Sequence, residues 1–365
     1  MGSSGRRRYL IWIAYAGGVY GRFNAMAKHP KSPSSVMSLL ERVISETLRI
    51  DWRQARISPS SRTDAGVHAL RNAVTADLPV HFTPIPSIRD PNDCTQWKKC
   101  WNEALEDYGF ADSLKILDVH PVATGFNGRY HVAYRKYVYR LCVENPEVDW
   151  ASTLSYYGHP DAYPHLGGFG ELNHSWMIRP PFDVYKARQA CALFKGEQNV
   201  ASFYPFDDTE LTNNKIPGWE LDTMRYFLSV SLDPGQPYCK SRDPVLNAHM
   251  ADLYHCYNFT VVARSFVKRQ IRRMMSWIVA IASGKRTMDD LKWLLDNPHP
   301  SHWLRFNLKD APAHGLYLTD VVYDPRMYTD PVPQYQLGWD LSPPLRILHG
   351  SSQPVTLLHG DKDAG

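Results

Sequence analysis

The sequence lacks the short motifs that mark most common enzyme classes. It contains no G-x-x-x-x-G-K-[ST] phosphate loop, no G-x-G-x-x-G after a strand, no H-E-x-x-H and no G-x-S-x-G. An aspartic protease needs two carboxylates from two similar motifs, and the D-A-G string at Asp64 has no counterpart elsewhere. These absences argue against nucleotide-dependent enzymes, zinc proteases, serine hydrolases and aspartic proteases.

Long apolar runs and paired cysteines are also missing. No run reaches the roughly 18 apolar residues of a membrane span, and the basic start at Arg6, Arg7 and Arg8 leads directly into strand-like sequence. The six cysteines form no C-x-x-C pair and no zinc-finger spacing with histidine. We therefore expect no membrane partner, reduced thiols, no metal, and an intracellular location in the cytoplasm, the nucleus or the mitochondrion.

The composition is that of a folded globular protein. The chain has 365 residues, of which 44% are apolar and 21% charged, so it has room for two domains. The net charge of +4 is too small to indicate a nucleic-acid partner by itself. Basic residues do gather, however, at residues 6–8 and at Lys268, Arg269, Arg272 and Arg273.

Hydrophobic periodicity predicts alternating helices and strands without a regular βαβ rhythm. Helices are expected at residues 36–48, 96–108, 183–195, 267–283 and 288–296, and strands at 9–17, 72–78, 114–119, 134–143, 224–232, 255–263 and 315–323. The first helix is capped either by a Ser38 and Glu41 box or one turn earlier, by Ser34 or Ser35. An α+β fold with a largely antiparallel sheet follows.

Composition also suggests the domain organisation. Residues 146–182 hold many prolines, glycines and aromatics without a period, which is typical of a linker or an inserted loop. We expect an N-terminal α/β subdomain at 1–145 with the Asp64 loop, a C-terminal α/β subdomain at 183–325, and a loosely held Pro-rich tail at 326–365.

The segment from Arg62 to Gly66 concentrates charge and backbone freedom between two strand-like runs. A nearby arginine favours the ionised form of a carboxylate, and Gly66 permits a close approach to a ligand. The loop is suited to present one oriented aspartate, although an isolated R-T-D-A-G is more often an ordinary turn with a local ion pair. Nine consecutive positions favour the first reading: S-R-T-D-A-G-V-H-A, from Ser61 to Ala69, resembles the signature loop of the TruA-type tRNA pseudouridine synthases.

Three further blocks extend this resemblance in order along the chain. They are F-N-G-R-Y-H-V-A-Y-R-K-Y-V-Y-R-L at 126–141, R-S-F-V-K-R-Q-I-R-R-M-M-S-W-I-V-A-I-A-S-G-K at 264–285, and A-P-A-H-G-L-Y-L-T-D-V-V-Y at 311–323. The resemblance implies a pseudouridine synthase fold, two α/β subdomains with an RNA-binding cleft between them. It also implies a homodimer that binds tRNA across both subunits, and isomerisation of uridine to pseudouridine without a cofactor.

The resemblance assigns roles to individual residues. Asp64 is the nucleophile or base, Arg272 reaches it from the third block, Tyr137 packs on the target base, and Arg62 expels the neighbouring base or holds a phosphate. Lys268, Arg269 and Arg273 are expected to contact RNA phosphates. Outside the resemblance, an aromatic in an alternating strand is usually core, and a helical arginine is usually solvated. His68 is expected to be a structural hydrogen-bonding partner.

Two departures from the family pattern leave the target uridine open. The usual Trp-Gln pair is missing from the segment that begins at Tyr15, and Asn199 stands where an acid is usual. Both resemble a divergent eukaryotic pseudouridine synthase-like branch. Insertions at 144–181 and 233–254 alter surfaces around the predicted cleft. The alternatives are an RNA-binding tRNA chaperone without useful turnover and a metal-dependent RNA hydrolase, for which the carboxylates near Asp64 are too few.

Overall fold

The computed structural model describes residues 5–20, 23, 35–79, 94–149, 171, 173–205, 222–237 and 252–333. Within these residues, one sheet of ten strands runs through the molecule in the order β4-β1-β3-β10-β5-β9-β8-β7, with β2 added to β3 and β6 added to β5. The strands are β1 (Arg6–Tyr15), β2 (Ile57–Pro59), β3 (His68–Pro79), β4 (Leu114–Val122), β5 (Val132–Glu144), β6 (Trp176–Ile178), β7 (Gly196–Asn199), β8 (Met224–Pro234), β9 (Tyr254–Ala263) and β10 (Leu316–Tyr323).

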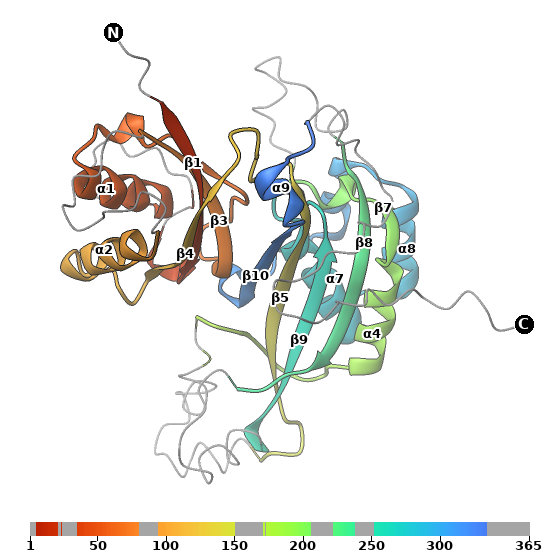
Figure 1. The fold of residues 1–365 in the computed structure, drawn as a ribbon. Helices are drawn as coiled ribbons and strands as arrows, with labels where there is room; N and C mark the ends of the chain where they lie inside the picture. The colour runs from red at the N-terminus through yellow and green to blue at the C-terminus, as the bar shows by residue number, and fades with distance from the viewer. Residues whose placement is uncertain are drawn as a thin grey trace, which may run out of the picture.

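The sheet is largely antiparallel, which confirms the predicted α+β class. Only β3 with β10 and β5 with β6 pair in parallel among the described strands. The closing strand β10 lies between β3 and β5, two strands of the first half of the chain (Figure 1). Strand β5 also pairs with β9, so both predicted subdomains share one sheet, and β10 places the loop before β3 close to Tyr137 of β5.

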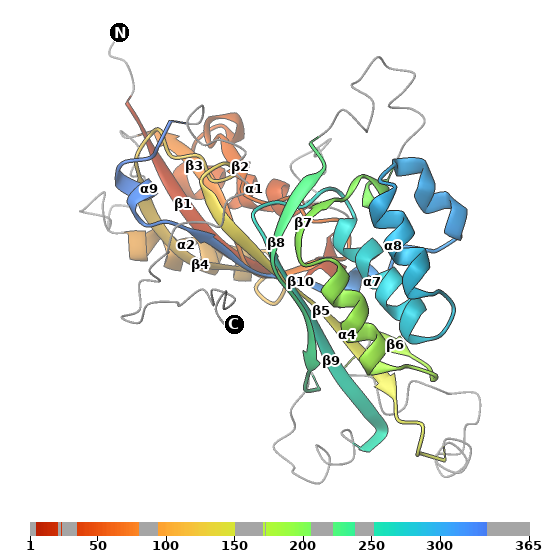
Figure 2. The same ribbon diagram turned by 90° about the vertical axis from the view of Figure 1, so that its right-hand side faces the viewer.

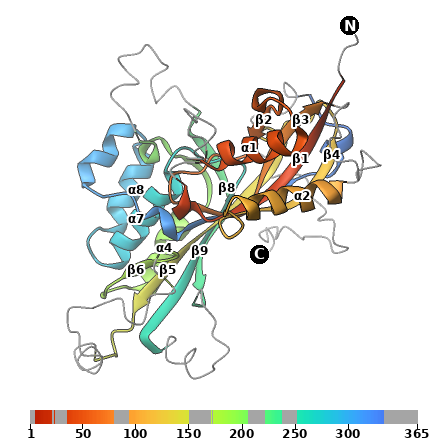
Figure 3. The ribbon, with the colours of Figure 1, turned by 90° about the vertical axis from the view of Figure 1, so that its left-hand side faces the viewer.

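Helices group at the two ends of this sheet. Helices α1 (Val36–Leu48) and α2 (Cys94–Asp107) lie over β1, β3 and β4 (Figure 3), while α4 (Val184–Leu193), α7 (Gln270–Ala282) and α8 (Met288–Asp296) gather beside β8 and β9 (Figure 2). Short helical turns complete the fold: η1 (Gly17–Val19), η2 (Trp52–Gln54), η4 (Ala201–Phe203), η5 (Pro300–Phe306), η6 (Ala313–Gly315) and α9 (Arg326–Thr329). No helix in the described ranges has the length and apolar character to cross a bilayer.

The boundaries of α1 agree with the prediction. Its apolar positions are buried, and Ser35 accepts from the backbone N–H of Ser38 while the Ser38 hydroxyl accepts from that of Ser35. The earlier of the two proposed caps is therefore the correct one. Helix α7 begins at Gln270, three residues later than predicted, because its N-cap residue Arg269 takes the left-handed conformation with φ 59°.

Strand β6 was not predicted, because it lies in the segment 146–182 that reads as an irregular loop. It exists through parallel pairing with β5, in which Met177 lies opposite Cys142. Residues 150–170 and 172 of that segment, 238–251 of the second insertion and 334–365 of the tail lie outside the described residues. The start of the tail forms α9, where the Tyr328 carbonyl accepts from the backbone N–H of Ala123 at 2.7 Å.

Candidate active site

Asp64 lies in the loop that joins β2 to β3. These strands pair antiparallel up to Pro59 and Val74, so residues 60–67 form the turn between them. The turn closes on itself where the N–H of Val67 donates to the Asp64 carbonyl at 3.2 Å. Gly66 has a φ of +82°, and a Cβ added there would lie 3.1 Å from the Ala313 Cβ. Glycine thus allows the loop to lie directly against the turn before β10.

Two polar side chains from neighbouring strands hold this loop. The hydroxyls of Tyr15 and Thr63 are 2.8 Å apart, and the Asn72 amide donates to the Ser61 carbonyl at 3.0 Å and to the Tyr15 oxygen at 3.3 Å. Neither Tyr15 nor Asn72 was predicted as a site residue. The available signal was a polar residue at a strand position expected to be buried, since a fully buried amide needs partners.

Arg272 of α7 forms an ion pair with Asp64 across 208 residues of sequence. Its Nη1 lies 3.5 Å from Asp64 Oδ2, and its Nε donates to the Ala311 carbonyl at 2.6 Å. The Asp64 side chain is 28% exposed and that of Arg272 is 16% exposed. The Arg272 guanidinium thus orients the Asp64 carboxylate, and part of that carboxylate remains open to solvent.

Tyr137 lies beside the same loop. Its hydroxyl is 3.0 Å from the Ser61 hydroxyl, and its ring meets Phe266 edge to face with centroids 5.1 Å apart. Burial raises the pKa of Tyr137, and the Asp64 charge adds to this, so the phenol is protonated at neutral pH. Tyr137, Tyr139 and Leu141, which the alternation of β5 predicted on one face, are all buried, which confirms that alternation.

The basic residues at the start of α7 divide into two groups. Arg269 and Arg273 both form ion pairs with Asp310, at 3.2 and 3.1 Å. Arg273 is buried, donates to the Tyr204 carbonyl at 2.9 Å, and has its pKa lowered by desolvation. In contrast, Lys268 is exposed and makes no hydrogen bond or ion pair within the described part of the chain. The same holds for Arg62 in the Asp64 loop.

Comparison with known proteins agrees with this geometry. A family model described as tRNA pseudouridine synthase matches residues 190–324, which include Arg272 and β10. The "tRNA pseudouridine synthase-like 1" proteins of Mus musculus and Xenopus laevis are 25% and 26% identical, over 89% and 88% of this chain and 98% and 93% of their own lengths. The "tRNA pseudouridine synthase A" of Nitratidesulfovibrio vulgaris is 25% identical over 88% of this chain and 98% of its own.

The match to the family model covers the third and fourth sequence blocks. The structure brings the first three blocks together at Asp64, while the fourth supplies β10 and the Ala311 carbonyl. The chain is similar to the TruA-type pseudouridine synthases over most of its length. Its Asn199, found where this family usually has an acid, accepts from the Thr223 hydroxyl at 2.8 Å and from the N–H of Ala201 at 3.1 Å. Both contacts need only an acceptor oxygen, which the amide of asparagine and the carboxylate of an acidic residue each provide.

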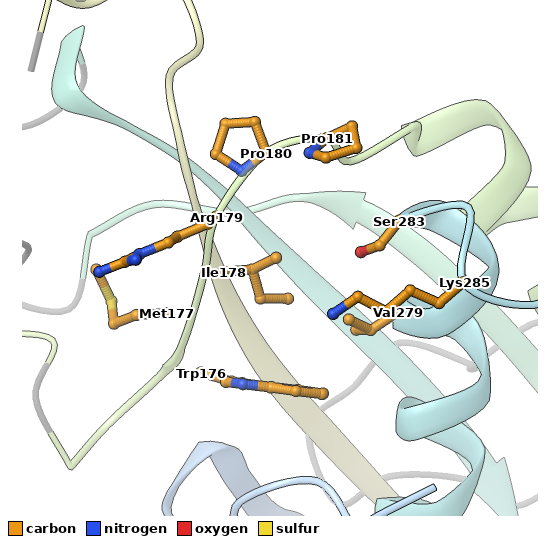
Figure 4. A pocket seen from close by; sticks show the side chains of 9 residues that line it. All are labelled: Trp176, Met177, Ile178, Arg179, Pro180, Pro181, Val279, Ser283 and Lys285. Atoms are coloured by element: carbon orange, nitrogen blue, oxygen red, sulfur yellow. The ribbon is translucent and has the colours of Figure 1, made fainter. Parts of the chain in front are cut away.

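One pocket among the described residues lies away from Asp64, Arg272 and Tyr137. It has a volume of about 260 Å³ and lies between β6 and the end of α7. Figure 4 shows Lys285 and Val279 facing Ile178 and Trp176 across it. None of the site residues that the TruA-type resemblance assigns lines this pocket, so we do not assign it to the reaction.

His68 of the TruA-type signature loop is a structural residue, as predicted. Its Nδ1 accepts from the N–H of Gly17 at 3.2 Å, and its Nε2 donates to the Asn173 carbonyl at 3.0 Å. The ring stacks on Tyr317 with centroids 4.7 Å apart. Both ring nitrogens are therefore used in the neutral tautomer, and the ring links the signature loop to Asn173.

The pH dependence of folding should reflect this buried histidine. Burial lowers the pKa of His68 from 6.5 to about 4. Below pH 6.5 the unfolded chain binds a proton at this position that the folded chain does not, so stability is lost as the pH falls from 6.5 towards 4. We expect His68 to account for a loss of about 2 kcal/mol between pH 7 and pH 5.

Urea unfolding at the two pH values measures this loss. His68→Gln should lose less stability than the wild type on acidification, because glutamine retains a donor and an acceptor without a titrating group. His255→Gln is the matched control, since His255 is exposed. Equal pH dependence in the wild type and His68→Gln would contradict the assignment.

Gly17 should be essential to the loop in a way that Gly18 is not. A Cβ on Gly17 would lie 2.1 Å from the Val67 carbonyl oxygen, whereas one on Gly18 would have nothing within 4 Å. Because the clash is with backbone, Gly17→Ala must displace the signature loop, at a cost of about 3 kcal/mol or more. We expect thermal unfolding to show a clear loss for Gly17→Ala and almost none for Gly18→Ala. Similar melting temperatures for the two variants would refute this packing.

Proposed function

We propose that this protein is a tRNA pseudouridine synthase that isomerises uridine, by analogy in the anticodon stem-loop. The single observation that carries the proposal is the Asp64–Arg272 pair at 3.5 Å, with Tyr137 bonded to the same loop through Ser61. Arg272 and Tyr137, which are distant in the sequence, thus both contact the loop that carries the partly exposed Asp64 carboxylate. The names of the relatives support the same chemistry.

The reaction requires little besides an oriented carboxylate. The bond between uracil N1 and C1′ breaks, the base turns, and a bond forms between C5 and C1′. The atoms of substrate and product are the same, so the chemistry needs neither a redox partner nor a group donor. Asp64 acts either by covalent addition or by removal of a sugar proton to give a glycal.

The surrounding residues divide the remaining tasks. Arg272 keeps Asp64 oriented, because its guanidinium is fixed in turn by the Ala311 carbonyl. The protonated Tyr137 hydroxyl assists proton movement together with Ser61. Its ring is only 6% exposed, so stacking on a flipped uracil follows a displacement of Phe266.

The exposed basic residues contact the RNA phosphates. Arg62 and Lys268 lack protein partners in the described ranges and are available to RNA, and Arg269 is half exposed beside Asp310. Arg273 is the exception among the predicted phosphate ligands. Because its guanidinium is buried against Asp310, Tyr204 and Trp303, we propose that it holds α7 in place rather than contacting RNA.

We further propose that the protein acts as a homodimer with tRNA bound across both subunits, in the cytoplasm, nucleus or mitochondrion. This extends the family resemblance to the assembly. Light scattering of the purified chain, alone and with tRNA, measures the stoichiometry. A monomer that binds tRNA one to one would overturn the dimer but not the reaction.

Release of tritium from tRNA labelled at uridine C5 tests the reaction itself, since C5 exchanges its hydrogen for a carbon bond. We expect release without added metal and in the presence of a chelator. A protein that binds tRNA but releases no tritium would be an RNA chaperone with the same fold, and chelator-sensitive RNA cleavage would indicate a hydrolase. Mapping pseudouridine in RNA from cells with and without the protein identifies the target uridine.

A further inference from the structure

Two cysteines that are distant in the sequence lie face to face in the sheet. Cys142 of β5 and Cys256 of β9 are directly opposite in antiparallel register, and their Sγ atoms are 3.2 Å apart. Opposed residues of antiparallel strands have Cα atoms about 4.5 or 5.5 Å apart, and both spacings lie within the range that a disulfide spans. A bond between these sulfurs therefore needs no movement of the backbone.

The two thiols differ in access and in chemical environment. Cys142 is fully buried, whereas Cys256 is partly exposed. The hydrogen bond between the two sulfurs lowers the pKa of Cys256 and raises that of Cys142. Burial and the Glu171 carboxylate act against this by raising the pKa of Cys256, and the Arg140 guanidinium lowers it. The accessible sulfur is thus the nucleophile, and the buried one is poised to resolve a mixed disulfide.

A nearby carboxylate might suggest a metal centre, since Glu171 lies within 4.8 Å of both sulfurs. That carboxylate already accepts two hydrogen bonds from Arg140, at 3.0 and 3.2 Å, and one from the Ser175 hydroxyl. The Arg140 charge beside the sulfurs opposes a bound cation. The cluster is therefore built for a pair of thiols rather than for a metal.

We propose that Cys142 and Cys256 form a reversible disulfide by exchange with a low-molecular-weight disulfide. The Cys256 thiolate attacks one sulfur of the small disulfide, and a small thiolate leaves. The Cys142 thiol then loses its proton and attacks the Cys256 sulfur, which expels the second small thiolate. Two protein thiols and one small disulfide become one protein disulfide and two small thiols, so two electrons pass to the small molecule.

The site is distinct from the reaction centre. Cys142 is five residues beyond Tyr137 on β5, which is about 17 Å along a strand. It does adjoin residues 173–178, the segment whose Asn173 carbonyl accepts from His68 of the signature loop. The disulfide would cross-link β5 to β9, and Met177 of β6 lies opposite Cys142 in the same sheet.

Equilibration of the full chain in reduced and oxidised glutathione at defined ratios tests the proposal. Free thiols are then labelled, and peptides are analysed by mass spectrometry. We expect a Cys142–Cys256 linkage with a measurable midpoint, while partly exposed Cys100 stays unlinked to another cysteine. Cys142→Ala should trap a glutathione adduct on Cys256, Cys256→Ala should leave Cys142 unmodified, and Cys100→Ala should behave as wild type.

Three results would overturn the inference. They are a pair that stays reduced at every ratio, a linkage between other cysteines, and one zinc ion that is retained through Cys142 and Cys256 and protects them from oxidation. The zinc result is measured by native mass spectrometry after addition of zinc alone. Because the main measurement uses the unmodified chain, it does not depend on the folding of any variant.

Discussion

Asp64→Asn should abolish pseudouridine formation and leave tRNA binding nearly unchanged. The substitution keeps the size of the side chain and an oxygen for Arg272, but it removes the group that either attacks or deprotonates the sugar. General acid or base catalysis alone contributes about 10² to 10⁴-fold, and a lost nucleophile costs more. We therefore expect kcat to fall by at least about 10³-fold in the tritium-release assay.

The matched control for this variant lies elsewhere in the same sheet. Asp320 of β10 forms an ion pair with Arg71 at 2.6 Å, and its side chain is 26% exposed, close to the 28% of Asp64. Asp320→Asn thus removes an equivalent carboxylate from an equivalent arginine, outside the reaction centre. We expect near wild-type kcat for it. Turnover in Asp64→Asn comparable to that of Asp320→Asn would exclude Asp64 as the reacting group.

Local patterns predicted the individual elements well. The helix at residues 36–48 was predicted to the residue, because its apolar spacing and its serine cap are both local features. The alternation of β5 was predicted for the same reason. Short strands such as β6 and β7 carry too few residues for a period, and they form only because a partner strand is available.

The association of distant residues was predicted only through the family resemblance. Nothing in the spacing of Asp64 and Arg272 indicates that they meet; they do so because β10 enters between β3 and β5 and carries the Ala311 turn against α7. The register of strand pairs depends on contacts between segments far apart, and not on local periodicity. The same limit explains why Asp310 and the opposed Cys142 and Cys256 were missed.

The arginines at the start of α7 are paired with carboxylates from other parts of the chain. Cations at a helix N-terminus oppose the helix dipole, so basic residues crowded at the start of α7 need nearby anions. The structure supplies Asp64 for Arg272 and adds Asp310 for Arg269 and Arg273. Only Lys268 is left without an anion in the described ranges, which makes it the best phosphate ligand of the four.

Arg272 should affect the reaction itself, whereas Lys268 should affect binding. Arg272 fixes the carboxylate through Nη1 while its Nε holds the Ala311 carbonyl, so Arg272→Gln leaves Asp64 without orientation. A displacement of about 1 Å at a reacting group costs about 10²-fold in rate. We expect kcat to fall by about that factor with little change in KM. Arg272→Lys should recover only part of the loss, because one ammonium group cannot serve both acceptors at once.

Lys268→Gln is the comparison that separates orientation from simple attraction of RNA. It removes one positive charge from the same end of α7 without touching Asp64. We expect KM to rise, kcat to stay constant, and the salt dependence of tRNA binding to weaken by about one unit of slope. If Arg272→Gln instead raises KM and changes the salt slope as Lys268→Gln does, Arg272 acts as a phosphate ligand, and its distance from Asp64 has no catalytic meaning. A loss of kcat confined to the Arg272 variants, with unchanged thermal stability, would assign the guanidinium to the orientation of the carboxylate.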